Sequence, residues 1–97
     1  MLDVVHCGKV VIGHDVIIWE NTTIHRAVYS WDQTTVGTWS RIGAQCHIDH
    51  GTKIEDHVVI CARCLLSGRT HVGRFAFIGP GSLVSNRLSV GANAKVC

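Results

Sequence analysis

The sequence contains a single proline and no apolar run long enough to cross a bilayer, for which about 20 consecutive apolar residues are needed. It also lacks a basic segment followed by an apolar one, the mark of a secretory leader. One proline and ten glycines among 97 residues argue against linkers and low-complexity tails. These absences predict one small, soluble, cytoplasmic domain that spans residues 1–97.

Cysteine is present, but not in a pattern that predicts disulfides. The five cysteines, an odd number, lie at positions 7, 46, 61, 64 and 97 and lack the spacing of a secreted scaffold. Cys61 and Cys64 form a Cys-x-x-Cys pair, but a tetrahedral zinc site would need a second pair. We therefore expect reduced thiols and no bound metal.

Aliphatic residues recur at every sixth position. Among the sixteen positions that are multiples of six, fourteen hold Ile, Val or Leu, and only His6 and Ser30 break the series. Four residues further on in each hexad the side chain is small or β-branched, with Leu88 as the bulkier exception. None of the sixteen Asp, Glu, Lys and Arg residues occupies either series. Chance would produce that avoidance with a probability of about 0.002, so the period reflects the fold.

A period of six excludes an amphipathic helix, because six is not a multiple of the 3.6 residues of a helical turn. Each hexad instead makes one short strand and one turn, with the large aliphatic and the small residue pointing inward. Three hexads close one triangular coil of about 18 residues. The sequence thus predicts an all-β fold, a single-stranded left-handed parallel β-helix of about five coils. Cys46 and Cys64 fall in one inward column, which favours a buried small residue over a metal ligand.

An irregular segment near residues 25–35 departs from the repeat. Ser30 replaces an aliphatic residue there, and Tyr29 and Trp31 flank it. One interpretation is a bulge or short excursion whose aromatic side chains cover exposed coil edges, the commoner use of aromatic residues. The other interpretation is a lip over a substrate groove between subunits.

Three hexads per coil arrange the sequence in columns of vertical neighbours. One predicted column reads His14, Asp32, His50, Gly68 and Asn86. Gly68 would leave a bare backbone N–H facing the space over the His50 imidazole, where a β-carbon would crowd a thioester. Acyl transfer needs such a pair, a base for the incoming amine or hydroxyl and a donor for the tetrahedral oxyanion. We predict His50 and Gly68 as catalytic residues. Asp49 or Asp32 would orient the ring.

The other histidines offer weaker candidates. His6, His14, His25, His57 and His71 are scattered over outward or corner positions, and each alone is expected at the surface. His47 precedes Ile48 in the same hexad as His50 and is expected to be only a neighbour on the outer face.

Three stretches, residues 21–26, 45–50 and 67–74, resemble UDP-3-O-acylglucosamine N-acyltransferase, an enzyme family of the lipid A pathway. The resemblance covers most of residues 10–97 and implies that His50 is the general base and Gly68 the oxyanion donor. Asp49-His50, Ser67-Gly68 and residues 77–81 are also similar to sialic acid and bacillosamine-type sugar acetyltransferases, which use acetyl-CoA. Both groups act as trimers, so the resemblance implies a homotrimer with the site between neighbouring prisms.

Basic side chains concentrate in the second part of the chain. Residues 57–97 carry five basic and no acidic side chains, whereas residues 1–56 carry four basic and seven acidic ones. This positive region would suit an acyl carrier protein or the phosphates of acyl-CoA or acetyl-CoA, and a solvated outer face is the alternative. We expect Arg69 and Arg87 to bind the donor.

Three function classes remain open. The first is acyl transfer from a thioester donor to the amine or hydroxyl of a sugar or nucleotide sugar, without a nucleic-acid partner. The second is a catalytically silent or truncated β-helix that acts as an interaction protein, which the absence of the family's flanking domains from this sequence favours. The third is a zinc enzyme similar to γ-class carbonic anhydrases, whose histidines lie five residues apart, a spacing not found around His50.

Overall fold

The computed structural model describes residues 8–29 and 31–96, and it confirms the predicted left-handed parallel β-helix. These residues form short strands and no helix, so none of them lies in a helix able to span a membrane. The strands are β1 Lys9–Ile12, β2 Ile17–Ile18, β3 Thr23–Ile24, β4 Gln33–Val36, β5 Arg41–Ile42, β6 His47–Ile48, β7 Lys53–Ile54, β8 Val59–Ile60, β9 Leu65–Leu66, β10 His71–Val72, β11 Phe77–Ile78, β12 Leu83–Val84, β13 Ser89–Val90 and β14 Lys95–Val96.

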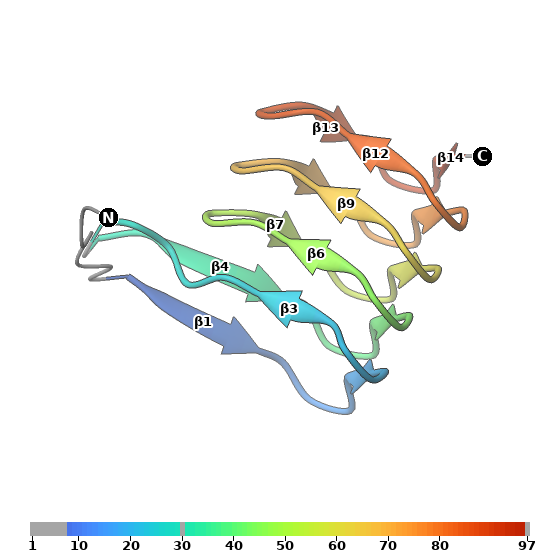
Figure 1. Ribbon diagram of the computed structural model, residues 1–97. Helices are drawn as coiled ribbons and strands as arrows, with labels where there is room; N and C mark the ends of the chain where they lie inside the picture. The colour runs from blue at the N-terminus through green and yellow to red at the C-terminus, as the bar shows by residue number, and fades with distance from the viewer. Residues whose placement is uncertain (1–7, 30, 97) are drawn as a thin grey trace.

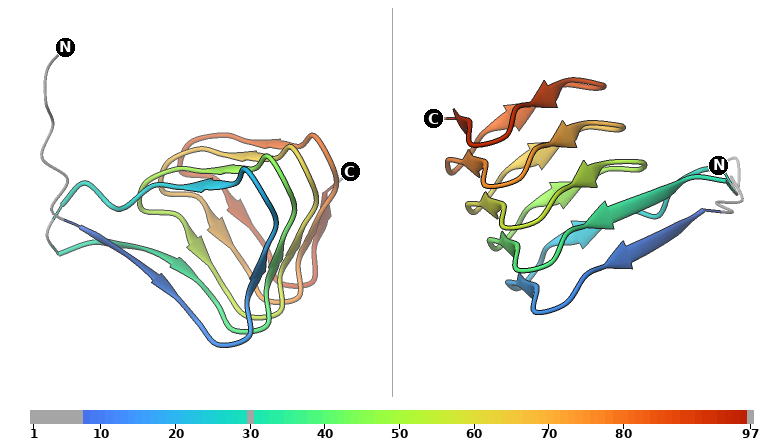
Figure 2. Two further views of the ribbon diagram at one scale, coloured as in Figure 1. Left: turned by 60° about the horizontal axis from the view of Figure 1, so that its bottom comes forward. Right: turned by 180° about the vertical axis from the view of Figure 1, so that it is seen from behind.

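Three parallel sheets form the faces of a triangular prism (Figures 1 and 2). The first sheet has the order β1-β4-β7-β10-β13, the second β2-β5-β8-β11-β14 and the third β3-β6-β9-β12. Neighbouring strands of a sheet are three strands apart in the chain, so each successive trio closes one coil. The described strands make four coils and two sides of a fifth, which agrees with the prediction of about five.

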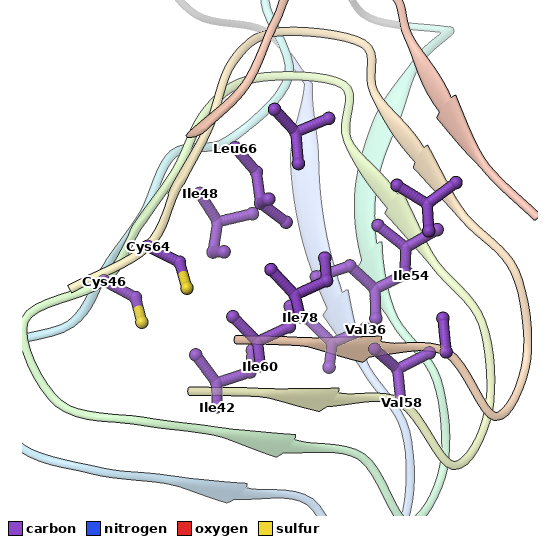
Figure 3. Close-up of a cluster of buried hydrophobic side chains, with 14 residues drawn as sticks. Val36, Ile42, Cys46, Ile48, Ile54, Val58, Ile60, Cys64, Leu66 and Ile78 are labelled. Atoms are coloured by element: carbon purple, nitrogen blue, oxygen red, sulfur yellow. The ribbon is translucent and has the colours of Figure 1, made fainter. Parts of the chain in front are cut away.

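The aliphatic residues of the repeat fill the prism (Figure 3). Every aliphatic position from Val36 to Val90 is at most 9% exposed. Ile12 is 47% exposed because β1 is the outermost strand of its sheet among the described residues. Cys46 and Cys64 both point into the interior, which confirms the predicted inward column.

The smaller inward residues bind backbone carbonyls of the next coil. Four of them are polar yet fully buried: Thr34, Ser40, Thr52 and Thr70. Ser40 Oγ donates to the carbonyl of Glu55 at 2.9 Å, and Cys64 Sγ donates to that of Gly79 at 3.2 Å. A hydroxyl or thiol at this position therefore adds a side-chain hydrogen bond to a backbone carbonyl of the next coil.

The first coil is longer than the others by one hexad. Lys9 of β1 pairs with Gln33 of β4, four hexads further along the chain. Thr35 of β4 pairs with Lys53 of β7, only three hexads further along. The extra residues leave the wall between β3 and β4, and this segment projects from the triangular outline in the left view of Figure 2. We call residues 25–32, which contain no described strand, the excursion. Ser30 and His6, the two breaks in the aliphatic series, lie outside the described residues.

Candidate functional site

His50, Gly68 and Asn86 lie one above another at the corner where the chain passes from the third sheet to the first. The backbone fixes this stack, because the N–H of Arg69 donates to the His50 carbonyl at 2.9 Å and the N–H of Arg87 to the Gly68 carbonyl at 3.0 Å. A β-carbon on Gly68 would lie 2.5 Å from Cε1 of His50 and 3.1 Å from Oδ1 of Asn86. The imidazole therefore rests directly against the glycine.

The backbone of Gly68 offers a free hydrogen-bond donor. Within the described part of the chain, no group accepts its N–H, although the residue is buried. The N–H groups of Ala44, Ala62 and Asn86 at other corners also have no acceptor among these residues, so the special feature of Gly68 is its contact with the imidazole. Glycine at this position leaves room for the His50 imidazole, which would have to shift to admit a β-carbon. A side chain would collide with the His50 imidazole itself, before it crowded any thioester.

The predicted orienting contact to His50 is not found among residues 8–29 and 31–96. Asp49 Oδ1 accepts the backbone N–H of His50 at 2.8 Å, so its carboxylate fixes the corner and not the ring. Asp32 binds Lys53 and Arg69 instead. Each carboxylate therefore binds a group other than the His50 ring.

The predicted column is wrong at its lower end. The N–H of His14 donates to Oγ1 of Thr38 at 3.2 Å, and the N–H of Trp39 donates to the His14 carbonyl at 3.0 Å. His14 thus lies beside Thr38 and not below Asp32. The extra hexad of the first coil causes this shift, because it lengthens the separation of paired residues there from three hexads to four.

A cavity of about 210 Å³ lies beside His50. Its lining includes Asn86, Arg69 and Arg87 from the corners, and Tyr29 and Asp32 from the excursion. Both arginines that the sequence analysis proposed for the donor therefore border the same cavity as His50. Sequence reasoning missed Tyr29 as a residue of this site. The break in the repeat at Ser30 indicated an irregular segment. Because such a segment does not follow the repeat, the sequence could not predict the directions of its side chains.

The aromatic side chains of the excursion do not cover the coil edge in the manner expected. Trp31 is 79% exposed and Tyr29 is half exposed, and their rings stack with centroids 4.7 Å apart and planes at 10°. The Arg69 guanidinium lies over the Tyr29 ring, 5.7 Å from its centroid. The lip interpretation thus gains support from the position of Tyr29 in the wall of the cavity.

Asp32 connects the excursion to the prism through two cations. Its Oδ1 lies 3.0 Å from Lys53 Nζ and its Oδ2 lies 3.0 Å from Nη2 of Arg69. Burial by itself would raise the pKa of Asp32. Hydrogen bonds from Lys53 and the Gln33 amide, with the charges of Lys53 and Arg69, outweigh burial and lower this pKa below its usual value. The carboxylate is therefore ionised at neutral pH.

Two predicted surface histidines have specific partners. The rings of His25 and His47 lie 4.6 Å apart, and Nε2 of His25 is buried without a hydrogen-bond partner in the described structure. His71 Nε2 lies 2.6 Å from Oε2 of Glu55. The predicted surface position is therefore confirmed for His71, which is exposed, and is wrong for the ring of His25, whose Nε2 is buried.

Three cysteines lie within the described residues, Cys46, Cys61 and Cys64, and all three are free thiols. Burial raises the pKa of the Cys64 thiol above its ordinary value, which keeps it protonated. Within the described ranges, no three His, Cys, Asp or Glu side chains gather closely enough to hold a metal ion.

A second hollow of about 400 Å³ is larger but lies at another corner. Its charged groups bind one another or the backbone. Asp56 Oδ1 accepts the Thr38 N–H at 2.8 Å, and Oε1 of Glu55 accepts the Arg74 N–H at 3.3 Å. The smaller cavity beside His50 is thus the better candidate for a reactive site, because a possible base and two arginines line it.

Fold, repeat and corner site together define a hexapeptide-repeat β-helix protein. No protein-family model matches the chain. Among known proteins, it is similar to acyl-(acyl-carrier-protein)–UDP-N-acetylglucosamine O-acyltransferase of Pseudomonas putida, with 37% identity over 87 residues, 89% of this chain and 34% of the relative. It is also similar to UDP-3-O-acylglucosamine N-acyltransferase of Methylococcus capsulatus, with 41% identity over 69 residues, 71% of this chain and 19% of the relative.

A solved structure shares the fold. The UDP-N-acetylglucosamine acyltransferase of Arabidopsis superposes with a TM-score of 0.55 and 33% identity, over 80% of this chain and 33% of that one. The predicted resemblance to hexapeptide-repeat acyltransferases is therefore confirmed, and it extends from N-acyltransferases to O-acyltransferases. The chain spans about a third of the length of the first relatives that it matches.

Proposed function

We propose that this β-helix transfers an acyl group from a thioester donor to the hydroxyl or amine of a nucleotide sugar. The observation that carries the proposal is the contact between the His50 imidazole and a buried glycine, Gly68, whose N–H has no acceptor in the described residues. Further support comes from the relatives, whose names describe acyl transfer to UDP-sugars.

In the proposed reaction, His50 acts as the general base. A neutral imidazole takes the proton of the attacking hydroxyl or amine as the new bond to the thioester carbonyl forms. The carbonyl oxygen becomes an anion and accepts a hydrogen bond from the Gly68 N–H. When the oxyanion collapses, the carbon–sulfur bond breaks, and the thiolate that leaves takes the proton from the imidazolium. The products are the acylated sugar and a free thiol.

The donor is proposed to approach over Arg69 and Arg87. Both side chains border the His50 cavity, and both carry positive charge in the basic part of the chain. Acyl carrier protein is the donor carrier in the name of the Pseudomonas relative, and acyl-CoA and acetyl-CoA present similar anionic groups. We place this reaction in the cytoplasm, where the free thiols of Cys46, Cys61 and Cys64 would stay reduced.

A second subunit is proposed to complete the site. The cavity of about 210 Å³ is smaller than the roughly 300–1,000 Å³ of most ligand pockets, and a nucleotide sugar with an acyl donor needs more room. A homotrimer with the His50 corner at the contact between prisms would supply the missing wall.

The experiment mixes the purified chain with an acyl-(acyl carrier protein) and UDP-N-acetylglucosamine, and follows the release of free thiol. The proposal predicts thiol release that depends on the sugar nucleotide, together with a product whose mass increases by one acyl group. Acetyl-CoA in a parallel reaction separates the two donor classes. Absence of sugar-dependent release with both donors would support the catalytically silent alternative.

A further inference from the structure

The extra hexad of the first coil emerges at the corner that carries His50. Thr23 of β3 pairs with His47 of β6, a separation of four hexads, whereas Thr35 of β4 pairs with Lys53 of β7, a separation of three. If the register of β3 is extended, position 26 lies next to position 50 of the following coil, and if the register of β4 is extended backwards, position 32 does so too. Positions 26 and 32 are thus the two ends of the extra hexad. The excursion thus leaves and rejoins the wall directly below His50, and it brings Tyr29 into the lining of the cavity.

Both ends of the excursion are fixed. Ala27 is fully buried, and its carbonyl accepts the Gly8 N–H at 3.1 Å. The N–H of Asp32 closes a turn on the Tyr29 carbonyl at 3.0 Å. The Asp32 carboxylate, whose side chain is only 12% exposed, then binds Lys53 and Arg69 of the prism.

Arg69 links this ion cluster to the proposed reaction centre. Its backbone N–H binds the His50 carbonyl, and it follows Gly68 directly in the chain. Its guanidinium meets Asp32 on one side and the Tyr29 ring on the other. Arg69 also lies at a corner with a positive φ of 59°. This uncommon backbone conformation fixes the direction of its Cα–Cβ bond. The Asp32 carboxylate is thus linked to the Tyr29 ring through the Arg69 guanidinium.

We propose that Asp32 is a positioning residue and Tyr29 a specificity-determining residue for the sugar-nucleotide acceptor. Asp32 holds Arg69 and the excursion so that Tyr29 forms a rigid wall of the His50 cavity. Trp31 braces that wall by stacking on Tyr29. The identity of the substrate in this inference rests on the proposed function. The geometry of the cluster does not depend on it.

A fluorine label tests the geometry without any activity. Tyr29 is the only tyrosine of the chain, so incorporation of 3-fluorotyrosine gives a single ¹⁹F resonance. Asp32→Asn should shift this resonance, and Lys53→Met should shift it less because the Asp32–Arg69 pair remains. Glu55→Gln is the matched control, since it removes contacts with His71 and Arg74 at another corner and should leave the resonance in place. An unchanged resonance in both Asp32→Asn and Lys53→Met would overturn the positioning role.

Kinetics test the specificity. Asp32→Asn and Tyr29→Ala should raise the apparent KM for UDP-N-acetylglucosamine about tenfold with kcat changed less than about threefold, because they alter binding and not proton transfer. Glu55→Gln should change neither constant. A normal KM in Tyr29→Ala would overturn the specificity role. A wild-type protein without transferase activity contradicts the proposed function, and the ¹⁹F shifts still decide whether Asp32 positions Tyr29.

Discussion

The corners of the prism repeat one unusual backbone conformation. Twelve described corner residues, evenly spaced by one hexad except across the excursion, have a positive φ, and only Gly51 and Gly81 among them are glycines. The other ten are Asp15, Asn21, Trp39, Gln45, His57, Arg63, Arg69, Phe75, Arg87 and Asn93. Side chains with a β-carbon are disfavoured there by about 1–2 kcal/mol each, and the hydrogen bonds between coils must offset this cost.

Gly51 is expected to be harder to replace than Gly81, although both have a strongly positive φ, 71° and 72°. A β-carbon on Gly51 would lie 3.0 Å from Asp32 Oδ2 and 3.1 Å from Arg69 Cγ, whereas one on Gly81 meets nothing within 4 Å. Gly81→Ala should cost about 1 kcal/mol of unfolding free energy from backbone strain alone. Gly51→Ala should cost at least about 1 kcal/mol more, because it crowds the ion cluster. Urea denaturation measures both, and equal losses would contradict this description of the site.

Spacing alone placed some residues of the site correctly. The period of three hexads brought His50, Gly68 and Asn86 into one stack, because regular coils fix vertical neighbours. The period could not give the partners of Asp32, which depend on how the long side chains of Lys53 and Arg69 bend toward it.

At the level of the strand, two residues suffice in all described strands except β1 and β4, because each two-residue strand has one inward and one outward side chain. In β8, Ile60 is 1% exposed and its neighbour Val59 is 37% exposed. Ile60→Asp should abolish folding, since an unpaired carboxylate in this core costs several kcal/mol of a total stability of about 5–15 kcal/mol. Val59→Asp introduces the same charge on the outer face and should leave a folded protein. Circular dichroism separates the two, and a folded Ile60→Asp variant would show that the inward register is wrong.

The excursion shows what a broken repeat can and cannot reveal. Ser30 in an aliphatic position led to the prediction of an irregular segment near residues 25–35, and the structure assigns no strand to residues 25–29 and 31–32. Because the inserted length is one whole hexad, the aliphatic series resumes in phase at Val36. Periodicity therefore gave no sign that the first coil holds extra residues, and this led to the wrong placement of His14.

The ion cluster at the base of the excursion should make stability depend on pH in the acid range. The pKa of Asp32 is lowered in the folded protein, so its stabilising contribution is fully present above the ordinary value of 3.8. That contribution should be lost as the pH falls below this value and through the folded pKa. Asp32→Asn should therefore lose less stability than the wild type between pH 5 and pH 2, measured by urea unfolding. Parallel curves for the two proteins would contradict the role of the cluster.

For the whole molecule, the proposed site requires more than one prism. A homotrimer predicts a light-scattering mass near three times the chain mass of 10.6 kDa. The expectation follows from the small cavity at the His50 corner, which a neighbouring subunit would enlarge into a closed site. A monomer at all measured concentrations would remove the intersubunit site and leave only the shallow cavity of one chain.

The most direct test of acyl transfer at this corner compares two histidines in one assay. The His50 imidazole lies where a β-carbon on Gly68 would be, whereas the His47 ring lies 4.6 Å from the ring of His25. With an acyl-(acyl carrier protein) and UDP-N-acetylglucosamine, His50→Ala should lower kcat by about 10²–10⁴, the contribution of a positioned general base. His47→Ala should lower it less than about tenfold. If His50→Ala retained near wild-type turnover in an assay where the wild type is active, His50 would not be the base and the account of this site would be wrong.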